Sequence, residues 1–426
     1  MNKEVLKQII IENQGFVASI ELVKRNLQIE PLGNYIFTGS RRAGKTYCLF
    51  QIIQGLLEEG IDKSRILYIN FEDERLMEMT VNDLASIIDA YSELYPDKPI
   101  FFLDEIQNIE GWEKFCRRLA DMKYRVFITG SNAKMLSREM ATVLGGRFLI
   151  KEIYPFSFTE YLKANQIELN PNWMYGTVRF EVRRLFDTYF VYGGFPELLN
   201  FREKRMWLDN VYQKIFYSDL IARYKIRNEF ALKLLIKKLA ENIHDEVSFS
   251  RIKNIIQSSG TKIGTNTVIE YCEALGETYL TFGLSNYLAK IADRESLKKY
   301  YFIDNGILSL FLFNPDTILL ENIVAVHLKE QFGQDFYYLR GDTEVDFYIP
   351  SEKRLIQVAY NLNSAETEKR ECNALVKAIA KLQEREPGEE KRNYEAIIIT
   401  LDMEKEIEYE NRTIRVVPVW KWLLSE

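Results

Sequence analysis

The residues best suited to chemistry lie at 39–46, in the stretch GSRRAGKT. Its spacing fits G-x-x-x-x-G-K-[ST] at Gly39, Gly44, Lys45 and Thr46. In such a loop the glycines let backbone N–H groups turn toward a phosphate, and the following helix adds the positive end of its dipole. Lys45 would reach the β- and γ-phosphates, and the Thr46 hydroxyl would ligate Mg²⁺. The stretch therefore predicts a phosphate-binding loop.

The predicted nucleotide-binding set is this loop and the residue after it: Gly39, Ser40, Arg41, Arg42, Ala43, Gly44, Lys45, Thr46 and Tyr47. A chance Gly-Lys turn is the alternative. It is disfavoured because a short apolar run precedes the loop and an amphipathic helical pattern follows it.

Two adjacent acids, Asp104 and Glu105, end the apolar run FFLDEIQ. Asp104 is placed to hold the Mg²⁺ shell, with Thr46 as the second metal ligand. Glu105 is placed to orient or deprotonate an attacking water, and is the first predicted catalytic residue. The alternative is that both acids cap the next helix. With the loop upstream, a pair of acids favours hydrolysis over transfer by a kinase.

Further candidates lie in three other segments. In ITGSNAK, Ser131 or Asn132 would sense the γ-phosphate, although Asn132 serves equally well as a helix cap. In GGRF, Arg147 would neutralise transition-state charge on its own nucleotide or on that of a neighbouring subunit. The alternative is a surface arginine paired with a carboxylate. Within YINFED, Asn70 and Glu72 are candidates to face the same cleft.

The elements that must position these residues are short apolar runs alternating with helical patterns. The runs lie at 34–37, 65–71, 99–104, 124–129 and 147–153. Nearly continuous apolar runs are typical of parallel strands buried on both faces. The alternation predicts a doubly wound α/β sheet over the first part of the chain.

The motifs TGSRRAGKT, YINFED, FFLDEIQ, ITGSNA, GGR and YGGFPE together resemble bacterial and archaeal AAA-superfamily ATPases that carry a restriction-endonuclease-like C-terminal domain. The resemblance implies a P-loop NTPase sheet in the order 5-1-4-3-2, and ATP with Mg²⁺ as the ligands. It implies four domains: an ATPase core at 1–160, a helical lid at 161–228, a winged helix at 229–295 and the nuclease-like domain at 296–426.

Two details of the middle domains bear on function. The turn YGGFPE is either a hinge of the lid or a tight helix–helix connection, since glycine permits positive φ and proline stops a helix. In the winged-helix segment the third helix contains Glu270, Glu273 and Glu277 and no basic residue. Because a recognition helix usually offers Lys or Arg to DNA, a structural or protein-docking role is favoured and DNA binding is not.

The nuclease-like resemblance is incomplete at its centre. Such a centre uses carboxylates to hold Mg²⁺ and a lysine to activate water. Glu321 and Asp346 match the two acids, with Glu344 beside them. Where the family has acid-x-lysine, this chain has Gln357 and Ala359. Gln357 lacks the negative charge of the acid, and Ala359 lacks the positive charge of the lysine. We therefore expect a nuclease-like fold that does not cleave and serves as a docking surface or sensor.

The bulk composition limits the remaining classes. The chain has 426 residues and a net charge of −6, which disfavours a protein that coats nucleic acid. Its four cysteines form no CxxC pair, and no apolar run is long enough for a membrane span, so a cytoplasmic location is expected. The function predicted is a Mg-dependent ATPase switch that docks an unidentified protein partner. A DNA-processing ATPase, a scaffold without turnover and oligomerisation are left open.

Overall fold

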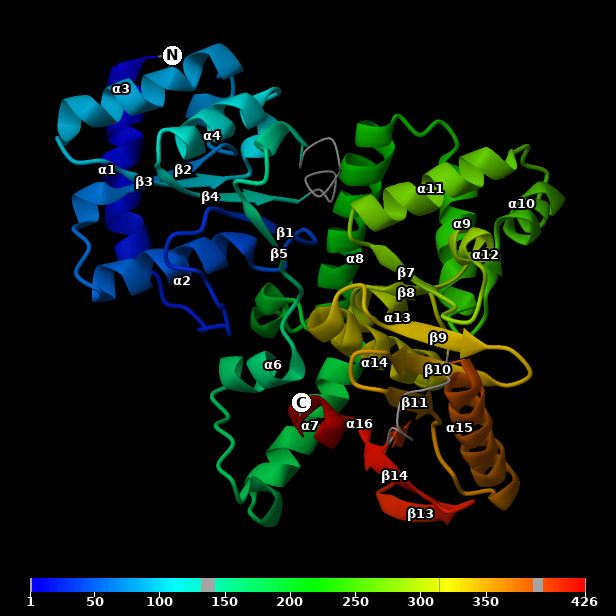
Figure 1. Cartoon of the computed structure of the whole chain (residues 1–426). Helices are drawn as coiled ribbons and strands as arrows, with labels where there is room; N and C mark the ends of the chain where they lie inside the picture. Colours follow the sequence, from blue (N-terminus) through cyan, green and yellow to red (C-terminus); the bar gives the residue numbers. More distant parts are fainter. Residues whose placement is uncertain (1, 132–141, 314, 386–393, 426) are drawn as a thin grey trace. The chain divides into compact units, whose positions relative to one another are not determined.

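A computed structural model of the chain describes residues 2–131, 142–313, 315–385 and 394–425 (Figure 1). The chain forms two compact units: Met1–Pro155 with Glu277–Tyr279, and Phe156–Gly276 with Leu280–Glu426. Within the described ranges, no helix is both long and apolar enough to cross a membrane.

The first unit is built on one sheet of five parallel strands in the order β2-β3-β4-β1-β5. Read from the other edge this is 5-1-4-3-2, which confirms the predicted P-loop NTPase fold. Its helices and strands are α1 (Lys3–Ser19), β1 (Tyr35–Thr38), α2 (Lys45–Glu58), β2 (Ile66–Asn70), α3 (Ala85–Leu94), β3 (Ile100–Asp104), α4 (Trp112–Asp121), β4 (Arg125–Gly130) and β5 (Leu149–Glu152). Short 3₁₀ turns lie at Lys63–Arg65, Glu74–Leu76, Val81–Asp83 and Ile106–Asn108.

Both faces of this sheet are covered, which explains the nearly continuous apolar runs. Successive strand residues point to opposite faces, so Ile36 packs with α1, α3 and α4 while Phe37 packs with α2. Phe101 and Phe102 divide in the same way. Burial on two sides fixes the register of each strand. It therefore fixes which residues stand at the carboxyl edge of the sheet.

The second unit begins with helices. They are α6 (Phe158–Ala164), α7 (Val178–Tyr192), α8 (Lys204–Lys214), a π-helix at Ile215–Ala222, α9 (Glu229–Glu241), α10 (Phe249–Ser258), α11 (Thr265–Glu277), α12 (Ile291–Ser296) and α13 (Asn305–Ser309), with 3₁₀ turns at Trp173–Tyr175 and Pro196–Asn200. Three strands accompany them: β6 (Val247–Ser248), β7 (Thr281–Ser285) and β8 (Leu297–Phe302). The order β6-β8-β7 is antiparallel, and β7 pairs with β8.

The glycines of the YGGFPE turn pack closely around one buried acid. The carboxylate of buried Asp304 accepts hydrogen bonds from the N–H groups of Gly194 and Gly306, each at 2.8 Å. A Cβ on Gly193 would lie 2.0 Å from the Asp304 carboxylate, and one on Gly194 would lie 2.1 Å from the Phe156 carbonyl oxygen. Burial raises the pKa of Asp304 to about 6. The glycines are needed here for close packing around one buried acid.

The second unit ends in a six-stranded mixed sheet in the order β13-β14-β12-β11-β10-β9. Its elements are α14 (Asp316–Phe332), β9 (Tyr337–Arg340), β10 (Glu344–Ile349), β11 (Arg354–Val358), α15 (Ala365–Arg385), β12 (Glu395–Thr400), β13 (Lys405–Tyr409), β14 (Arg412–Pro418) and α16 (Val419–Ser425). One face packs on α14 and α16, and the other packs on α15.

Candidate nucleotide and magnesium site

The phosphate-binding loop joins β1 to α2, and its backbone can be made only by glycine at two points. Gly39 has φ +147°, and a Cβ there would lie 2.0 Å from the carbonyl oxygen of Ile153. Gly44 has φ 95°, in the left-handed region, and caps α2, which begins at Lys45. The loop therefore stands at the start of a helix whose first N–H groups have no partner inside the helix.

Lys45 is held inside the loop that it completes. Its side chain is buried, and Nζ donates to the carbonyl oxygens of Gly39 at 3.1 Å and Ser40 at 3.0 Å. Outside the loop, Arg25 Nη1 donates to the Ala43 carbonyl oxygen at 3.1 Å and to the Tyr154 carbonyl oxygen at 3.0 Å. Arg25 thus connects the backbone of the loop to the backbone that follows β5. Its place far upstream in the sequence gave no signal of this role.

Asp104 lies at the carboxyl end of β3 and is almost fully buried. The Thr46 hydroxyl donates to its Oδ2 at 2.9 Å, and the Tyr68 hydroxyl donates to the same oxygen at 2.8 Å. The Thr129 hydroxyl donates to Oδ1. Burial raises the pKa of Asp104 to about 6, against the effect of these hydroxyl donors. The two predicted metal ligands, Thr46 and Asp104, are therefore in direct contact.

Glu105 follows Asp104 with a left-handed backbone, φ 52°, which is uncommon for a residue with a side chain. Its N–H donates to Thr129 Oγ1 at 2.9 Å, and its Oε1 lies 4.0 Å from Lys45 Nζ. Gln107 Nε2 donates to its other carboxylate oxygen. The turn thus points the carboxylate of Glu105 toward the loop rather than along the strand direction.

The residues present fit a bound phosphate with a magnesium ion. Ser40 Oγ in the loop and Ser131 Oγ after β4 are buried and have no hydrogen-bond partner within the part of the chain that the structure describes. A buried hydroxyl without a partner is costly, and a bound phosphate or water would supply one. The Thr46 hydroxyl and the Asp104 carboxylate supply the oxygen ligands that Mg²⁺ prefers.

The other predicted residues have different outcomes. Asn132 lies outside the described residues. Asn70 Oδ1 accepts from the Glu72 N–H at 2.9 Å, and Glu72 lies 3.8 Å from Arg41 of the loop. Arg42 and Tyr47 are exposed at the mouth of the loop.

Arg147 does not lie near the loop of its own chain, so that prediction is corrected. It precedes β5, whose first residue Leu149 pairs with Tyr35 at the start of β1. Because the strands are parallel, this edge is opposite to the one that carries the loop. Its Nε lies 2.5 Å from Asp121 Oδ1, which is the surface pairing considered above. A role on a neighbouring subunit's nucleotide stays a prediction.

Two contributors were missed in the sequence, Tyr68 and Thr129. Tyr68 is on β2 and Thr129 is on β4, the two neighbours of β3 in the sheet. Both hydroxyls contact Asp104. The strand order implied by the resemblance was the signal that could have found them, because it places polar residues of β2 and β4 beside the end of β3.

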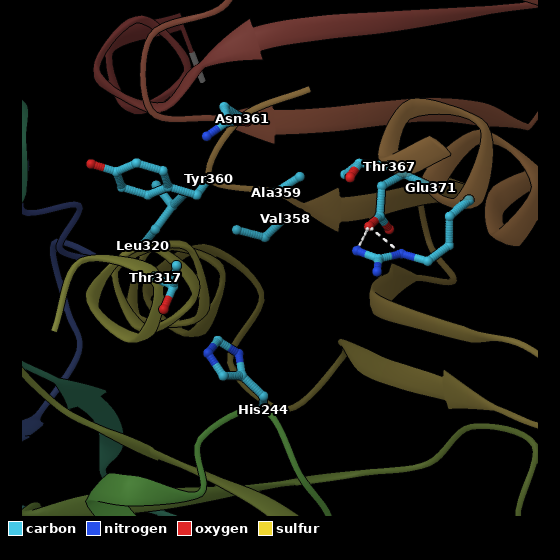
Figure 2. Close-up of a pocket in the computed structure, with 10 residues that line it drawn as sticks. His244, Thr317, Leu320, Val358, Ala359, Tyr360, Asn361, Thr367 and Glu371 are labelled. Carbon is cyan, nitrogen blue, oxygen red and sulfur yellow. Dashed lines mark hydrogen bonds and ion pairs between the residues drawn. The ribbon is translucent and has the colours of Figure 1, made fainter. Parts of the chain in front are cut away.

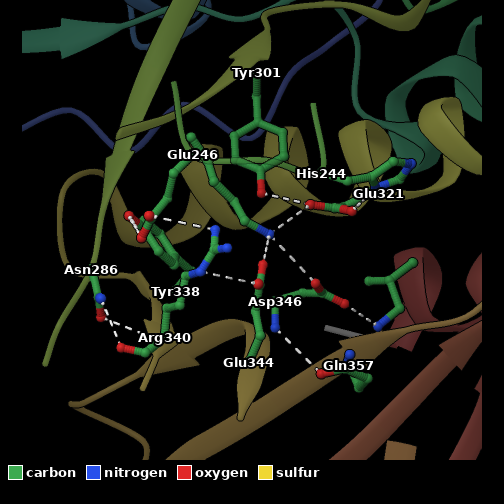
Figure 3. A network of polar contacts seen from close by, with 12 residues as sticks. His244, Glu246, Asn286, Tyr301, Glu321, Tyr338, Arg340, Glu344, Asp346 and Gln357 are labelled. Atoms are coloured by element: carbon green, nitrogen blue, oxygen red, sulfur yellow. Dashed lines mark hydrogen bonds and ion pairs between the residues drawn. The ribbon is translucent and has the colours of Figure 1, made fainter. Parts of the chain in front are cut away.

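A second polar cluster lies in the second unit, where the nuclease-like residues were expected (Figure 3). Glu321 of α14 and Asp346 of β10 are both buried. Asp346 Oδ2 accepts from the Val358 N–H at 2.8 Å, and its own N–H donates to Gln357 Oε1 at 3.4 Å. Burial and the charge of Glu321 raise the pKa of Asp346 to about 7, whereas Lys299 and His244 hold the pKa of Glu321 at about 2 despite its burial. The fold does bring the predicted acids together.

A pocket of about 260 Å³ opens beside this cluster (Figure 2). His244, Ala359 and Arg370 are among its lining residues. His244 Nδ1 contacts Glu321, while Arg370 is paired with Glu371. Ala359, where the resemblance led us to look for a lysine, is therefore a small apolar residue on the wall of this pocket.

Comparison with known proteins defines the family. Residues 33–162 match the family described as AAA domain, and residues 183–317 match a domain of unknown function, DUF8612. The uncharacterized protein MJ1544 of Methanocaldococcus jannaschii is 35% identical over 442 residues, covering 100% of this chain and 96% of that protein. This chain belongs to the MJ1544 family. An uncharacterized protein of Haemophilus influenzae is 30% identical over 92% of this chain and 94% of its own length.

In this member of the MJ1544 family the AAA match covers β1 through β5 and the loop, so the first unit contains an AAA-type P-loop ATPase domain. The DUF8612 match runs from within α7 into the start of α14. Among solved structures, the Walker-type ATPase PABY2304 of Pyrococcus abyssi aligns with a TM-score of 0.40 and 11% identity, over 73% of this chain and 95% of that chain.

The buried acid Asp104 gives the site of this chain an expected pH dependence. Since the pKa of Asp104 is raised to about 6, the carboxyl takes up a proton as the pH falls through that value and then no longer attracts Mg²⁺. The apparent Mg²⁺ affinity of nucleotide binding should fall about tenfold per pH unit below 6 and be constant above 7. Titrations with Mg²⁺ from pH 5 to 8 measure this.

Asp104 affects the free energy of unfolding in the direction opposite to its effect on Mg²⁺ affinity. The native state holds the proton more tightly than the unfolded chain does, so this group favours folding at low pH. Its contribution falls as the pH rises from about 4 to about 6.

For the Mg²⁺ titrations, an affinity that is flat from pH 5 to 7 would contradict the assignment of Asp104 as the metal-binding acid.

Proposed function

We propose that this chain binds Mg-ATP, hydrolyses it, and uses the cycle as a conformational switch that docks a protein partner through the second unit. One observation carries the proposal: Lys45 of the loop, the Thr46–Asp104 pair and Glu105 lie together at the carboxyl edge of the parallel sheet. Ligands bind at this edge in open α/β sheets. The AAA match over 33–162 supports the same class of ligand.

Each residue has a distinct role in this proposal. The N–H groups of the loop hold the phosphates, and Lys45 neutralises charge on the β- and γ-phosphates. Thr46 and Asp104 hold Mg²⁺, which when bound neutralises charge that develops on the phosphate oxygens. Glu105 orients the attacking water and takes up its proton. Ser131 and Thr129 lie between the loop and the acids, where a hydroxyl can respond to the γ-phosphate.

The switch is the finer part of the proposal. Glu105 and Asp104 are linked through Thr129, so a change at the γ-phosphate reaches the start of the turn after β3. We assign partner docking to the second unit because its nuclease-like centre has Gln357 and Ala359 in place of acid and lysine. We also propose that the chain after the ATPase core is divided into a lid at 161–228, a winged helix at 229–295 and a nuclease-like domain at 296–426.

The test is direct binding and turnover with the full chain. A fluorescent ATP analogue should bind in the presence of Mg²⁺, should be displaced by unlabelled ATP, and should bind at least tenfold more weakly in EDTA. Phosphate release should likewise require Mg²⁺. Limited proteolysis with ADP and with a non-hydrolysable ATP analogue should give different cleavage patterns in 156–426. Failure to bind the analogue would refute the nucleotide site, binding unaffected by EDTA would refute the Mg²⁺ ligands, and identical cleavage patterns would refute the switch alone.

A further inference from the structure

The nuclease-like acids of the second unit converge on an ammonium group. Lys299 of β8 is fully buried, and its Nζ lies 2.8 Å from Glu344 Oε1. The same Nζ lies 3.5 Å from Glu321 Oε1 and 3.6 Å from Asp346 Oδ1 (Figure 3). The three carboxylates come from α14 and β10, while the lysine comes from a different sheet. One positive charge therefore stands at the point that all three acids share.

Charges in this position need a compensating cation. Removing carboxylates from water is expensive unless an opposite charge and hydrogen bonds replace the solvent. In a metal-dependent nuclease the divalent ion is the largest positive charge of the site. Here the ammonium is that charge. Burial alone would lower the pKa of Lys299, but the three carboxylates raise it above its ordinary value, so the group stays protonated at neutral pH.

Several of the carboxylate oxygens that a metal would use are also engaged. The Tyr301 hydroxyl donates to Glu321 Oε1 at 2.8 Å, and His244 contacts the other oxygen of Glu321. Asp346 Oδ2 accepts from the Val358 N–H. Among the residues that the structure describes, no group of three or more His, Cys, Asp or Glu side chains is arranged to hold a metal ion.

We propose that the ammonium of Lys299 is the permanent cation of this carboxylate centre and excludes a divalent metal from it. The inference does not depend on the nucleotide site. The centre then acts as an ionic connection between two sheets, because β8 belongs to the sheet β6-β8-β7 and Glu344 and Asp346 belong to the six-stranded sheet. Neighbouring contacts join the same parts: Glu246 accepts from the Tyr338 hydroxyl at 2.8 Å and lies 3.4 Å from Arg340 Nη1.

The opposing interpretation is that Lys299 is a relocated catalytic lysine beside a metal that binds to the same acids. The two interpretations predict different Mn²⁺ binding by the wild-type protein. With nucleotide-free full-length chain, free Mn²⁺ is measured by electron paramagnetic resonance for the wild type and for Asp346→Asn. We expect the same Mn²⁺ binding in both. Mn²⁺ binding that is lost in Asp346→Asn would overturn the proposal.

Substitutions at Lys299 test the compensating charge. Lys299→Met keeps the length of the side chain and removes the charge, and should lower the melting temperature by about 10 °C at pH 7.5. Lys298→Ala, one residue earlier on β8, is the matched control and should change it by less than about 3 °C. A Lys299→Met variant as stable as the wild type would show that the ammonium is not the required cation.

A third arm asks whether removal of the side chain opens the centre. Mn²⁺ should raise the melting temperature of Lys299→Ala by several degrees and should leave that of Lys299→Ala/Asp346→Asn unchanged. A Lys299→Ala protein that folds but ignores Mn²⁺ would count against the shared position of ammonium and metal. Should Lys299→Ala not fold, the comparison of wild type with Asp346→Asn decides between the interpretations alone.

Discussion

Replacing Glu105 with glutamine should leave ATP bound and lower the rate of phosphate release by about 10²–10⁴-fold, the usual range for loss of a general base. The carboxylate stands 4.0 Å from Lys45 Nζ at the point where the loop and β3 meet. Glutamine keeps its shape and keeps an oxygen that can accept from Gln107, so the fold should be preserved. Single-turnover phosphate release and nucleotide affinity, measured on the same samples, separate the two effects.

Glu110→Gln is the matched control for this substitution. Glu110 lies a few residues further along the same connection and is exposed, so its removal should leave both measurements unchanged. Equal rates for wild type and Glu105→Gln would refute the catalytic role of Glu105 while leaving nucleotide binding intact. If Glu105→Gln retains ATP, it is also the form in which a partner of the ATP-bound state should be captured.

The second large effect is expected at Lys45. Lys45→Ala removes the ammonium that would contact the phosphates, and should weaken ATP affinity by about 10²-fold, or about 3 kcal/mol, since loss of one partner of a buried charge pair costs about 2–5 kcal/mol. The binding titration with Mg²⁺ measures this directly. Because Lys45 also donates to the Gly39 and Ser40 carbonyl oxygens, Lys45→Met, which retains most of the side chain, should accompany it.

Lys63→Ala serves as the control, because Lys63 is exposed in the turn before β2. It should bind ATP as the wild type does. Unchanged affinity in both Lys45 variants would mean that the loop does not hold the nucleotide, and the proposed function would then be wrong. The two variants together give opposite outcomes: affinity is lost without Lys45 and kept without the Glu105 carboxylate.

The sequence was sufficient for the loop and the acids because their chemistry is local. Gly39, Gly44 and Lys45 are close together in the chain, and an acid after a buried strand needs a polar neighbour wherever the sheet places it. The order of the strands came from the family resemblance, and the structure confirms it. With that order, β2 and β4 flank β3.

The errors and omissions have a common cause, which is contact between residues that are distant in the chain. Arg147 was considered for the nucleotide of its own chain although it precedes its strand, and the start of a parallel strand lies at the edge opposite to the loop. Lys299 was not singled out at all, since one lysine in the run LKKYYF gives no sign of complete burial. Only the packing of β8 beside α14 and β10 shows what that lysine contacts.

The junction around Asp304 limits where the protein can be altered. Gly193, Gly194 and Gly306 leave no room for a side chain, so neither a longer turn nor a reporter group can be introduced there without disturbing the second unit. The segment from 165 to 177 is largely exposed and contains no long helix. Dyes, affinity tags and cross-linking handles for following the second unit are therefore best inserted in that segment, at a distance in sequence from the fixed junction.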